Sequence, residues 1–185
     1  MKSLNQVLAS FALVLCIAAG SALACGCGGM PGETFESIVA GAMNTSSMVF
    51  QGEVVGFEYR KGIRDEFDSG RIDSADRPLG YEKMVVKFKV ESWWKGDLAS
   101  AIFLVTGQNR YSDGTRSTNS CEFDFQKGKT YIVFADLNKA AAMPQTNNCS
   151  STREAKDEYG HADAIRKVLG KGTLPNKQIV SKLKR

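Results

Sequence analysis

The amino-acid sequence predicts an α+β fold that is mainly β, with a short helix before the strands and another after them. Three observations lead to this prediction. Five or so short segments are rich in β-branched and aromatic residues and are separated by turn residues. Apolar residues at helical spacing occur once before these segments and once after them. The length of 185 residues, less an N-terminal leader, suits one domain rather than two.

The first helix and strand are indicated by a change in apolar spacing. Residues 33–43 carry apolar side chains at helical spacing behind acidic residues, which predicts a short helix. Residues 48–57 are rich in β-branched and aromatic side chains and predict the first strand, in which Gly52 and Gly56 allow a bend or bulge. Residues 58–83 mix both signs of charge and predict a long hairpin connection, either a binding surface or a solvated excursion.

The middle of the chain predicts two further strands. Apolar and charged residues alternate cleanly over 84–90, as in a half-buried antiparallel strand. Trp93 and Trp94 follow, and we expect them to close the end of a barrel rather than to form a ligand platform. The continuous apolar run 101–106 predicts a buried strand, and the polar residues 108–120 are expected to be exposed.

The last third predicts one more strong strand and a terminal helix. Alternation over 121–125 places Cys121 on the inward side, and residues 131–135 predict the last strong strand. An irregular crossing over 138–148 is expected next. Ser151 followed by Glu154 fits a capping box, which predicts a helix from there to Gly170. A closed or partly closed barrel would remove the open edges of so few strands.

The first 24 residues have the form of a secretory signal peptide. Lys2 supplies a positive start, residues 7–19 are almost wholly apolar, and Ala22-Leu23-Ala24 has the small-x-small form of a signal-peptidase site. We therefore expect a secreted or periplasmic mature chain that begins at Cys25. No segment approaches the roughly 20 apolar residues of a transmembrane helix. A lipid anchor on Cys25 is the alternative, but a lipoprotein signal prefers a larger aliphatic residue than Ala22.

The cysteine count indicates two disulfides in the mature domain, residues 25–170. The leader removes one of the five cysteines and leaves Cys25, Cys27, Cys121 and Cys149, an even number in an oxidising compartment. A Cys25–Cys27 bond would close a very small strained ring, so each is expected to pair with a distant cysteine. A structural zinc site is the competing use of these thiols, but C-x-x-C pairs are absent.

The charge pattern gives no support to nucleic acid as a partner. The formal net charge of +4 is small for this length and is partly concentrated in residues 171–185, a basic tail expected to be solvated and frayed. The strands also lack the interleaved basic and aromatic residues that single-strand binding needs.

In their order and spacing, several motifs resemble the netrin-like domain of the tissue inhibitors of metalloproteinases and their bacterial relatives. The matching motifs are Cys25-Gly26-Cys27, Met48-Val49-Phe50-Gln51-Gly52-Glu53-Val54, Trp94-Lys95-Gly96, Cys121 with Phe123, Gly128-Lys129-Thr130-Tyr131-Ile132-Val133, and Cys149-Ser150.

This resemblance implies a fold and a function. It implies a five-stranded barrel of the oligonucleotide-binding type, with disulfides Cys25–Cys121 and Cys27–Cys149. It also implies that the α-amino and carbonyl groups of Cys25 chelate the catalytic zinc of a target protease, with Gly26 at the specificity pocket and Cys27 beside it. Gly26 brings no side chain to that pocket, and the animal inhibitors' C-terminal cysteine-rich subdomain is absent.

Two other classes of function compete with zinc-protease inhibition. One is a netrin-type module that binds another extracytoplasmic protein without contacting zinc. The other is a redox protein or enzyme using Cys25-Gly26-Cys27, for which C-x-x-C spacing and a nucleophile with its base are missing. The single histidine, His161, has no partner at metal-ligand spacing and is expected to be a surface or helix residue. We therefore expect no enzymatic activity and no cofactor.

Overall fold

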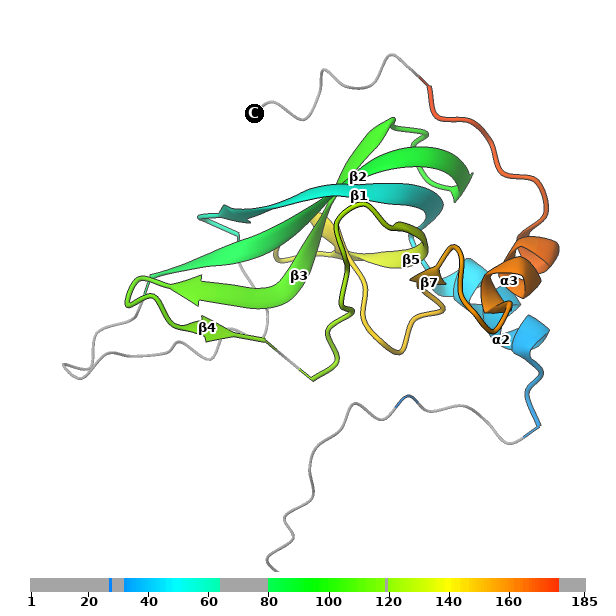
Figure 1. Ribbon diagram of the computed structural model, residues 1–185, viewed down its shortest axis with the longest axis horizontal. Helices are drawn as coiled ribbons and strands as arrows, with labels where there is room; N and C mark the ends of the chain where they lie inside the picture. Colours follow the sequence, from blue (N-terminus) through cyan, green and yellow to red (C-terminus); the bar gives the residue numbers. More distant parts are fainter. Residues whose placement is uncertain (1–26, 28–31, 64–79, 119, 177–185) are drawn as a thin grey trace, which may run out of the picture.

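The computed structural model describes residues 27, 32–63, 80–118 and 120–176. Within these ranges the chain forms two helices and seven strands (Figure 1). In chain order they are α2 (Phe35–Thr45), β1 (Met48–Arg60), β2 (Tyr81–Lys95), β3 (Ala101–Tyr111), β4 (Arg116–Ser117), β5 (Thr130–Asn138), β6 (Met143–Gln145), β7 (Arg153–Glu154) and α3 (His161–Leu169).

Five of the strands form a closed ring. The sheet runs in the order β1-β2-β3-β6-β5, and an additional antiparallel pairing of β1 with β5 joins its two ends. The β3–β6 pair is parallel, and the other pairs in the ring are antiparallel. β4 extends the sheet beside β3, and β7 lies beside β5. Ring closure satisfies the backbone donors and acceptors that a five-stranded open sheet would leave at its edges.

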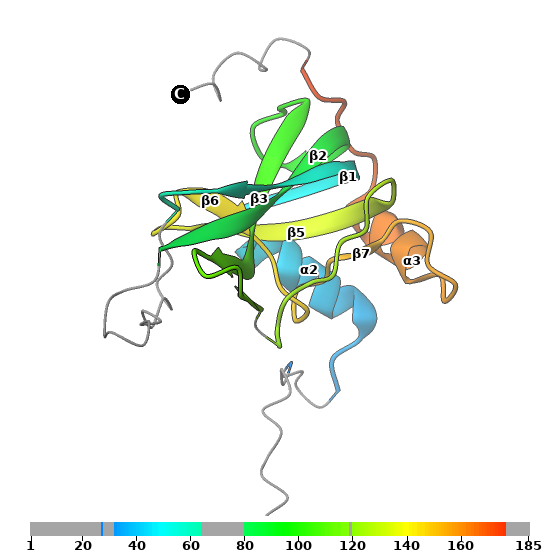
Figure 2. The same cartoon turned by 60° about the vertical axis from the view of Figure 1, so that its left-hand side comes forward.

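Two hydrophobic clusters hold this ring together. In the inner cluster the ring of Phe50 packs against those of Phe88 and Trp93, with ring centroids 5.3 and 5.2 Å away. The outer cluster lies between β1, β5 and the two helices, and it contains Val39 of α2 and Ile165 of α3, both fully buried. Figures 1 and 2 show α2 and α3 together on one side of the sheet. The start of β1, at Val49 and Phe50, and residues 131–135 of β5 are therefore buried on both faces.

The strands at the first hairpin are longer than the sequence predicts. β1 continues to Arg60, β2 begins at Tyr81, and the register pairs Tyr59 with Met84 and Arg60 with Lys83. Most charged residues of this ribbon reach solvent because paired strands leave one face exposed, although Lys83 is only 2% exposed. The connection expected over residues 58–83 is correspondingly shorter, and its central part lies outside the described residues. The alternation expected over 84–90 is confirmed from Val86 onward, where Val86, Phe88 and Val90 are buried and the intervening lysines are exposed, but it fails at Val85, which is fully buried.

The expectation for residues 108–125 is wrong in two places. β3 continues to Tyr111, which is only 7% exposed, and then turns back to form β4. Residues 121–125 form no strand, although Phe123 and Phe125 still pack against the inner cluster. Apolar alternation here reflects packing of an irregular segment, which periodicity alone does not distinguish from a strand.

The capping box expected at Ser151 and Glu154 is also wrong. Glu154 belongs to β7, where it pairs with Tyr131 of β5, so the backbone at this point is extended. The terminal helix starts later, after Gly160, which adopts a positive φ of 72°. Strand pairing overrides the capping-box pattern here, because β5 provides hydrogen-bond partners for the backbone at Glu154.

Asp157 provides the cap that begins α3. Its carboxylate accepts backbone hydrogen bonds from Tyr159 at 3.0 Å, His161 at 2.9 Å and Ala162 at 2.6 Å. Burial by itself would raise the pKa of Asp157, but these three backbone donors together hold the pKa below its ordinary value. His161 lies at the first helical position, half exposed, as expected for a helix-surface residue.

The two tryptophans pack into the body of the fold. Trp93 is 1% exposed within the inner cluster, and Trp94 packs on the outer cluster while its indole N–H donates to the carbonyl of Gly170 at 2.8 Å. The chain after α3 returns to β2, where Thr173 and Trp93 exchange two backbone hydrogen bonds of 2.8 and 2.7 Å. Within the described residues, no helix is long and apolar enough to cross a membrane.

Candidate functional site at the Cys27–Cys149 disulfide

Cys27 and Cys149 form a disulfide that ties the N-terminal segment to the loop between β6 and β7. Their Cα atoms are 4.9 Å apart, and both residues are exposed. The Cys27–Cys149 pairing implied by the resemblance is therefore confirmed. Because both sulfurs are oxidised, neither can act as a zinc thiolate or a nucleophile in this state. Cys25 and Gly26, the other two expected contact residues, lie outside the described residues.

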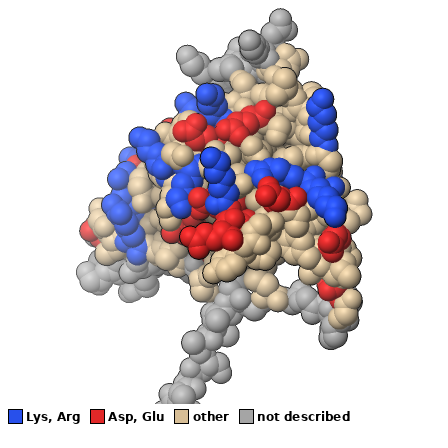
Figure 3. Space-filling model, turned by 45° about the vertical axis from the view of Figure 1, so that its right-hand side comes forward, with Lys and Arg blue, Asp and Glu red and all other residues tan. Residues whose placement is uncertain are grey.

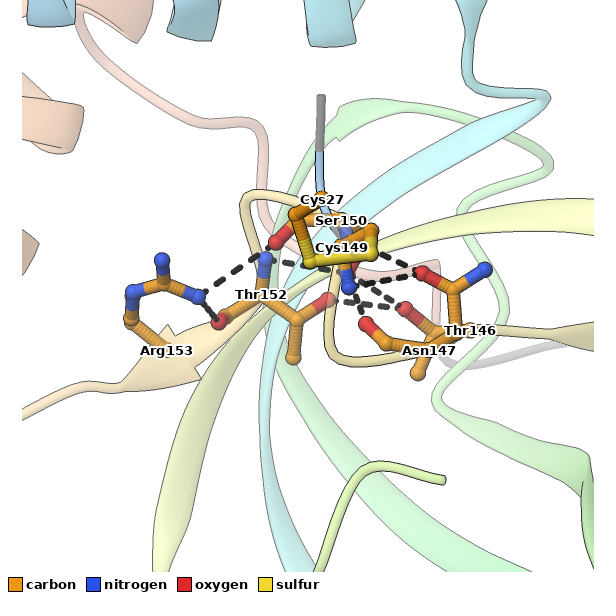
Figure 4. The surroundings of a disulfide bond; sticks show 7 residues. All are labelled: Cys27, Thr146, Asn147, Cys149, Ser150, Thr152 and Arg153. Carbon is orange, nitrogen blue, oxygen red and sulfur yellow. Dashed lines mark hydrogen bonds between the residues drawn. A yellow bond between two sulfur atoms is a disulfide. The ribbon is translucent and has the colours of Figure 1, made fainter. Parts of the chain in front are cut away.

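A network of short polar side chains shapes the loop that carries Cys149 (Figure 4). The side-chain carbonyl of Asn147 accepts backbone hydrogen bonds from Cys149 at 2.9 Å and Ser150 at 3.0 Å. The hydroxyl of Ser150 donates to the Asn147 carbonyl at 2.8 Å and accepts from the backbone N–H of Thr152 at 3.1 Å. This Asn-x-Cys-Ser turn satisfies its own backbone groups, so the disulfide sits on an ordered loop.

Two threonines anchor this loop to the ring. Thr152 is fully buried, and its hydroxyl oxygen accepts from the backbone N–H of Phe134 in β5 at 3.0 Å. The hydroxyl of Thr146 donates to the Phe134 carbonyl at 2.7 Å and lies 3.0 Å from the Thr152 hydroxyl. The hydroxyl groups of Thr146 and Thr152 thus serve as hydrogen-bond partners for the β5 backbone in the interval between β6 and β7. The position of Cys149 is therefore fixed by the closed sheet.

Cys121 lies next to the same loop. The backbone N–H of Asn148 donates to the Cys121 carbonyl at 2.8 Å, which brings the segment before β5 against the segment after β6. Cys121 is itself disulfide-bonded. The expected Cys25–Cys121 bridge involves a residue outside the described part of the chain and stays a prediction. The structure thus brings Cys27, Cys121 and Cys149 together at one edge of the ring, which we call the disulfide rim. The spacing of these cysteines in the sequence does not predict the asparagine and threonine hydrogen bonds that support the rim.

A polar groove with a volume of about 380 Å³ runs beside β7 and α3. Its charged groups are mostly paired: Lys129 with Glu154 at 2.8 Å, and Arg166 with Asp163 at 2.7 Å. The hydrogen bond that Lys129 donates to the Glu154 carboxylate raises the pKa of Lys129. On the face drawn in Figure 3, acidic and basic side chains are mixed. The remaining charged residues of the lining, Glu91 and Lys156, have opposite signs, so the groove has no large excess of either charge.

The described residues contain no group of three or more histidine, cysteine, aspartate or glutamate side chains placed to hold a metal ion. His161 instead contacts the rings of Phe35 and Tyr159, with centroids 5.6 and 5.9 Å away.

Comparison with known proteins adds no family assignment, because neither a protein-family model nor a curated protein sequence matches this chain.

Proposed function

We propose that the mature chain is a secreted or periplasmic inhibitor of zinc metalloproteases, built on a netrin-type barrel with two disulfides. The observation that carries the proposal is the Cys27–Cys149 disulfide, which attaches the segment just after the expected mature N-terminus to an ordered loop on the ring. A segment held in this way loses little conformational freedom when a protease cleft receives it. Preorganisation of this kind lowers the entropic cost of binding.

The chemical group that would inhibit the protease is the N-terminus of Cys25. A free α-amino group and the carbonyl of the same residue can close a five-membered chelate on a catalytic zinc, in the position otherwise taken by water. An α-amino group titrates near pH 8, so its neutral form is accessible at modest cost at neutral pH. Zinc chelation of this kind therefore requires Cys25 to be the first residue of the mature chain.

The described residues would contribute the surroundings of that chelate. The Asn147–Ser150 turn holds Cys149 and offers an exposed surface beside Cys27. Cys121 lies against the same turn through the Asn148 hydrogen bond, so two segments distant in sequence would meet the protease together. We expect this rim to supply the secondary contacts of the complex.

The test compares two N-termini on the same protein. The mature chain starting at Cys25 is prepared alongside a version with one extra alanine before Cys25, and both are checked by intact mass with and without reduction. Each is then titrated against a panel of secreted zinc metalloproteases with a fluorogenic peptide substrate. We expect the authentic N-terminus to inhibit and the extended one to lose inhibition by at least about a hundredfold, because a zinc-bound amine becomes an amide nitrogen.

A chain carrying one extra alanine at the C-terminus is the matched control and should inhibit like the mature protein. Equal inhibition by the two N-termini would refute zinc chelation by Cys25.

The second candidate function is a netrin-type module that binds a protein without contacting zinc. Gly26 favours this function, because glycine places no side chain in a specificity pocket. Binding of a protease or other extracytoplasmic protein with no loss of peptidase activity would support that module.

A further inference from the structure

Two arginines face each other at the end of the sheet formed by β3 and β4. Arg110 of β3 is the register partner of Arg116 in β4. Both guanidinium groups lie over the ring of Tyr59 in β1, at 4.2 Å for Arg110 and 6.0 Å for Arg116. We call Tyr59, Arg110 and Arg116 the arginine clamp. In Figure 1, β4, the strand that contains Arg116, lies away from α2 and α3.

The clamp breaks a rule of strand pairing. Like charges directly opposite each other in an antiparallel pair destabilise the sheet. Glu82 compensates Arg110 through a direct ion pair. Arg116 is exposed, and no carboxylate of the described residues pairs with its guanidinium. Compensation is therefore complete for Arg110 but not for Arg116, and a charge left without a paired carboxylate is expected where a site serves binding.

The hairpin holds Arg116 in a defined position. The backbone N–H of Tyr111 donates to the Thr115 carbonyl at 2.9 Å, and Gly114 takes the positive φ of 83° that the turn requires. Asp113 belongs to this turn and accepts from the backbone N–H of Thr115 at 2.9 Å, so its carboxylate stabilises the turn. The guanidinium of Arg116 is thus presented on an ordered ribbon.

Neighbouring residues repeat the pattern of a cation on a ring. Arg60 lies 4.1 Å from the ring centroid of Phe103, and Lys87 lies 5.7 Å from it. Glu58 pairs with Arg60. Arg60 follows Tyr59 in β1, so this second group lies on the opposite face of the paired strands. Among the described residues of the clamp and its ion pair, two arginines accompany one carboxylate, Glu82, and this excess of positive charge favours an anionic partner.

We propose that the arginine clamp binds carboxylate side chains in an acidic segment of a partner protein. The planar guanidinium fork of Arg116 can bind a carboxylate through two parallel hydrogen bonds, and Arg110 can add the N–H groups that Glu82 leaves unused. The guanidinium groups already occupy the ring of Tyr59, so that ring is not offered for stacking with a nucleic-acid base. The proposal uses none of the cysteines and is independent of protease inhibition.

The test measures binding of a fluorescein-labelled peptide of eight consecutive glutamates to the full mature chain by fluorescence anisotropy. We expect Arg116→Gln to weaken binding about tenfold, because charge-assisted hydrogen bonds are lost. Arg116→Lys should weaken it about fivefold despite keeping the charge, because lysine lacks the planar fork. Lys156→Gln, which removes one exposed positive charge before α3, should change binding less than twofold. Thermal unfolding of each variant verifies the fold.

Each alternative outcome would overturn a specific part of the proposal. No binding by the wild-type chain, or equal weakening in Arg116→Gln and Lys156→Gln, would reject the clamp as a site. Full binding by Arg116→Lys would reject the stacked, bidentate geometry. Displacement of the peptide by an inorganic polyphosphate or a sulfated polysaccharide at far lower charge concentration would reject an acidic protein segment as the partner.

Discussion

Removing the Cys27–Cys149 disulfide tests the feature on which the candidate site depends. The perturbation is the double substitution Cys27→Ala with Cys149→Ala, which leaves no unpaired thiol from this bond. The two cysteines are separated by 122 residues in the sequence. The chain-entropy model assigns an otherwise unlinked loop of that length about 5 kcal/mol of stabilisation, and less here because the expected Cys25–Cys121 bond would already close most of it; removal of a native disulfide typically costs about 2–5 kcal/mol.

The assay is urea unfolding of the wild-type and double-variant proteins, followed by the combined fluorescence of Trp93 and Trp94. We expect a loss of about 3 kcal/mol in the free energy of unfolding, which for a chain of this size corresponds to a fall in Tm of about 6–12 °C. Asn148→Ala, a change at an exposed position of the same loop, is the control and should stay within about 0.5 kcal/mol of wild type. An unchanged unfolding midpoint in the double variant would refute the reasoning, because the bond would then not restrict the unfolded chain.

Three further predictions concern the loop, the last helix and the expected inhibitory segment. Thr152→Val should cost about 1–3 kcal/mol of stability, measured by urea unfolding, because the buried N–H of Phe134 loses its acceptor. Asp157→Asn should lower stability at pH 7. Folding lowers the pKa of Asp157, so the ionised carboxylate stabilises the fold above the unfolded pKa of about 3.9, and this stabilisation is lost as the pH falls below that value. The variant should therefore show a shallower loss of stability below about pH 4. Gly26→Leu should strengthen protease inhibition about tenfold in the fluorogenic assay, because leucine adds apolar surface for a specificity pocket.

These three predictions have separate controls. Thr45→Val changes an exposed threonine at the end of α2 and should leave stability nearly unaltered; a similar cost at Thr45 and Thr152 would contradict the role of the Phe134 hydrogen bond. Parallel pH profiles for Asp157→Asn and wild type would contradict the cap at α3. Equal inhibition by Gly26→Leu and Gly26→Asp would show that residue 26 does not enter an apolar pocket.

The sequence predicts those parts of the fold that depend on periodicity. The alternation around Phe88 correctly identifies a half-buried strand, and the apolar run from Ala101 identifies a buried one, because burial patterns repeat every second residue in a strand. Trp93 is correctly assigned to the core on its position at a strand end.

The errors occur where long-range pairing decides the structure. Glu154 reads as part of a helix cap, but its pairing with Tyr131 across 23 residues makes it a strand residue. The threonine network under Cys149 and the facing pair Arg110 and Arg116 also depend on which segments meet in space. No local pattern encodes these contacts. The cysteine pattern predicts the two residues of the Cys27–Cys149 bond but not the side-chain network around them.

Closure of the ring also fixes the order in which the protein can assemble. β1, β2 and β3 follow one another along the chain and pair as neighbours, so they can form early. β1 finds its second partner only in β5, where Phe50 pairs with Val133, and this contact must close a loop of more than half the domain. Contacts between distant segments slow folding because loop entropy is lost before the contact is gained. We therefore expect a slow-folding chain in which Cys27 and Cys149 meet late, after β5 has completed the ring.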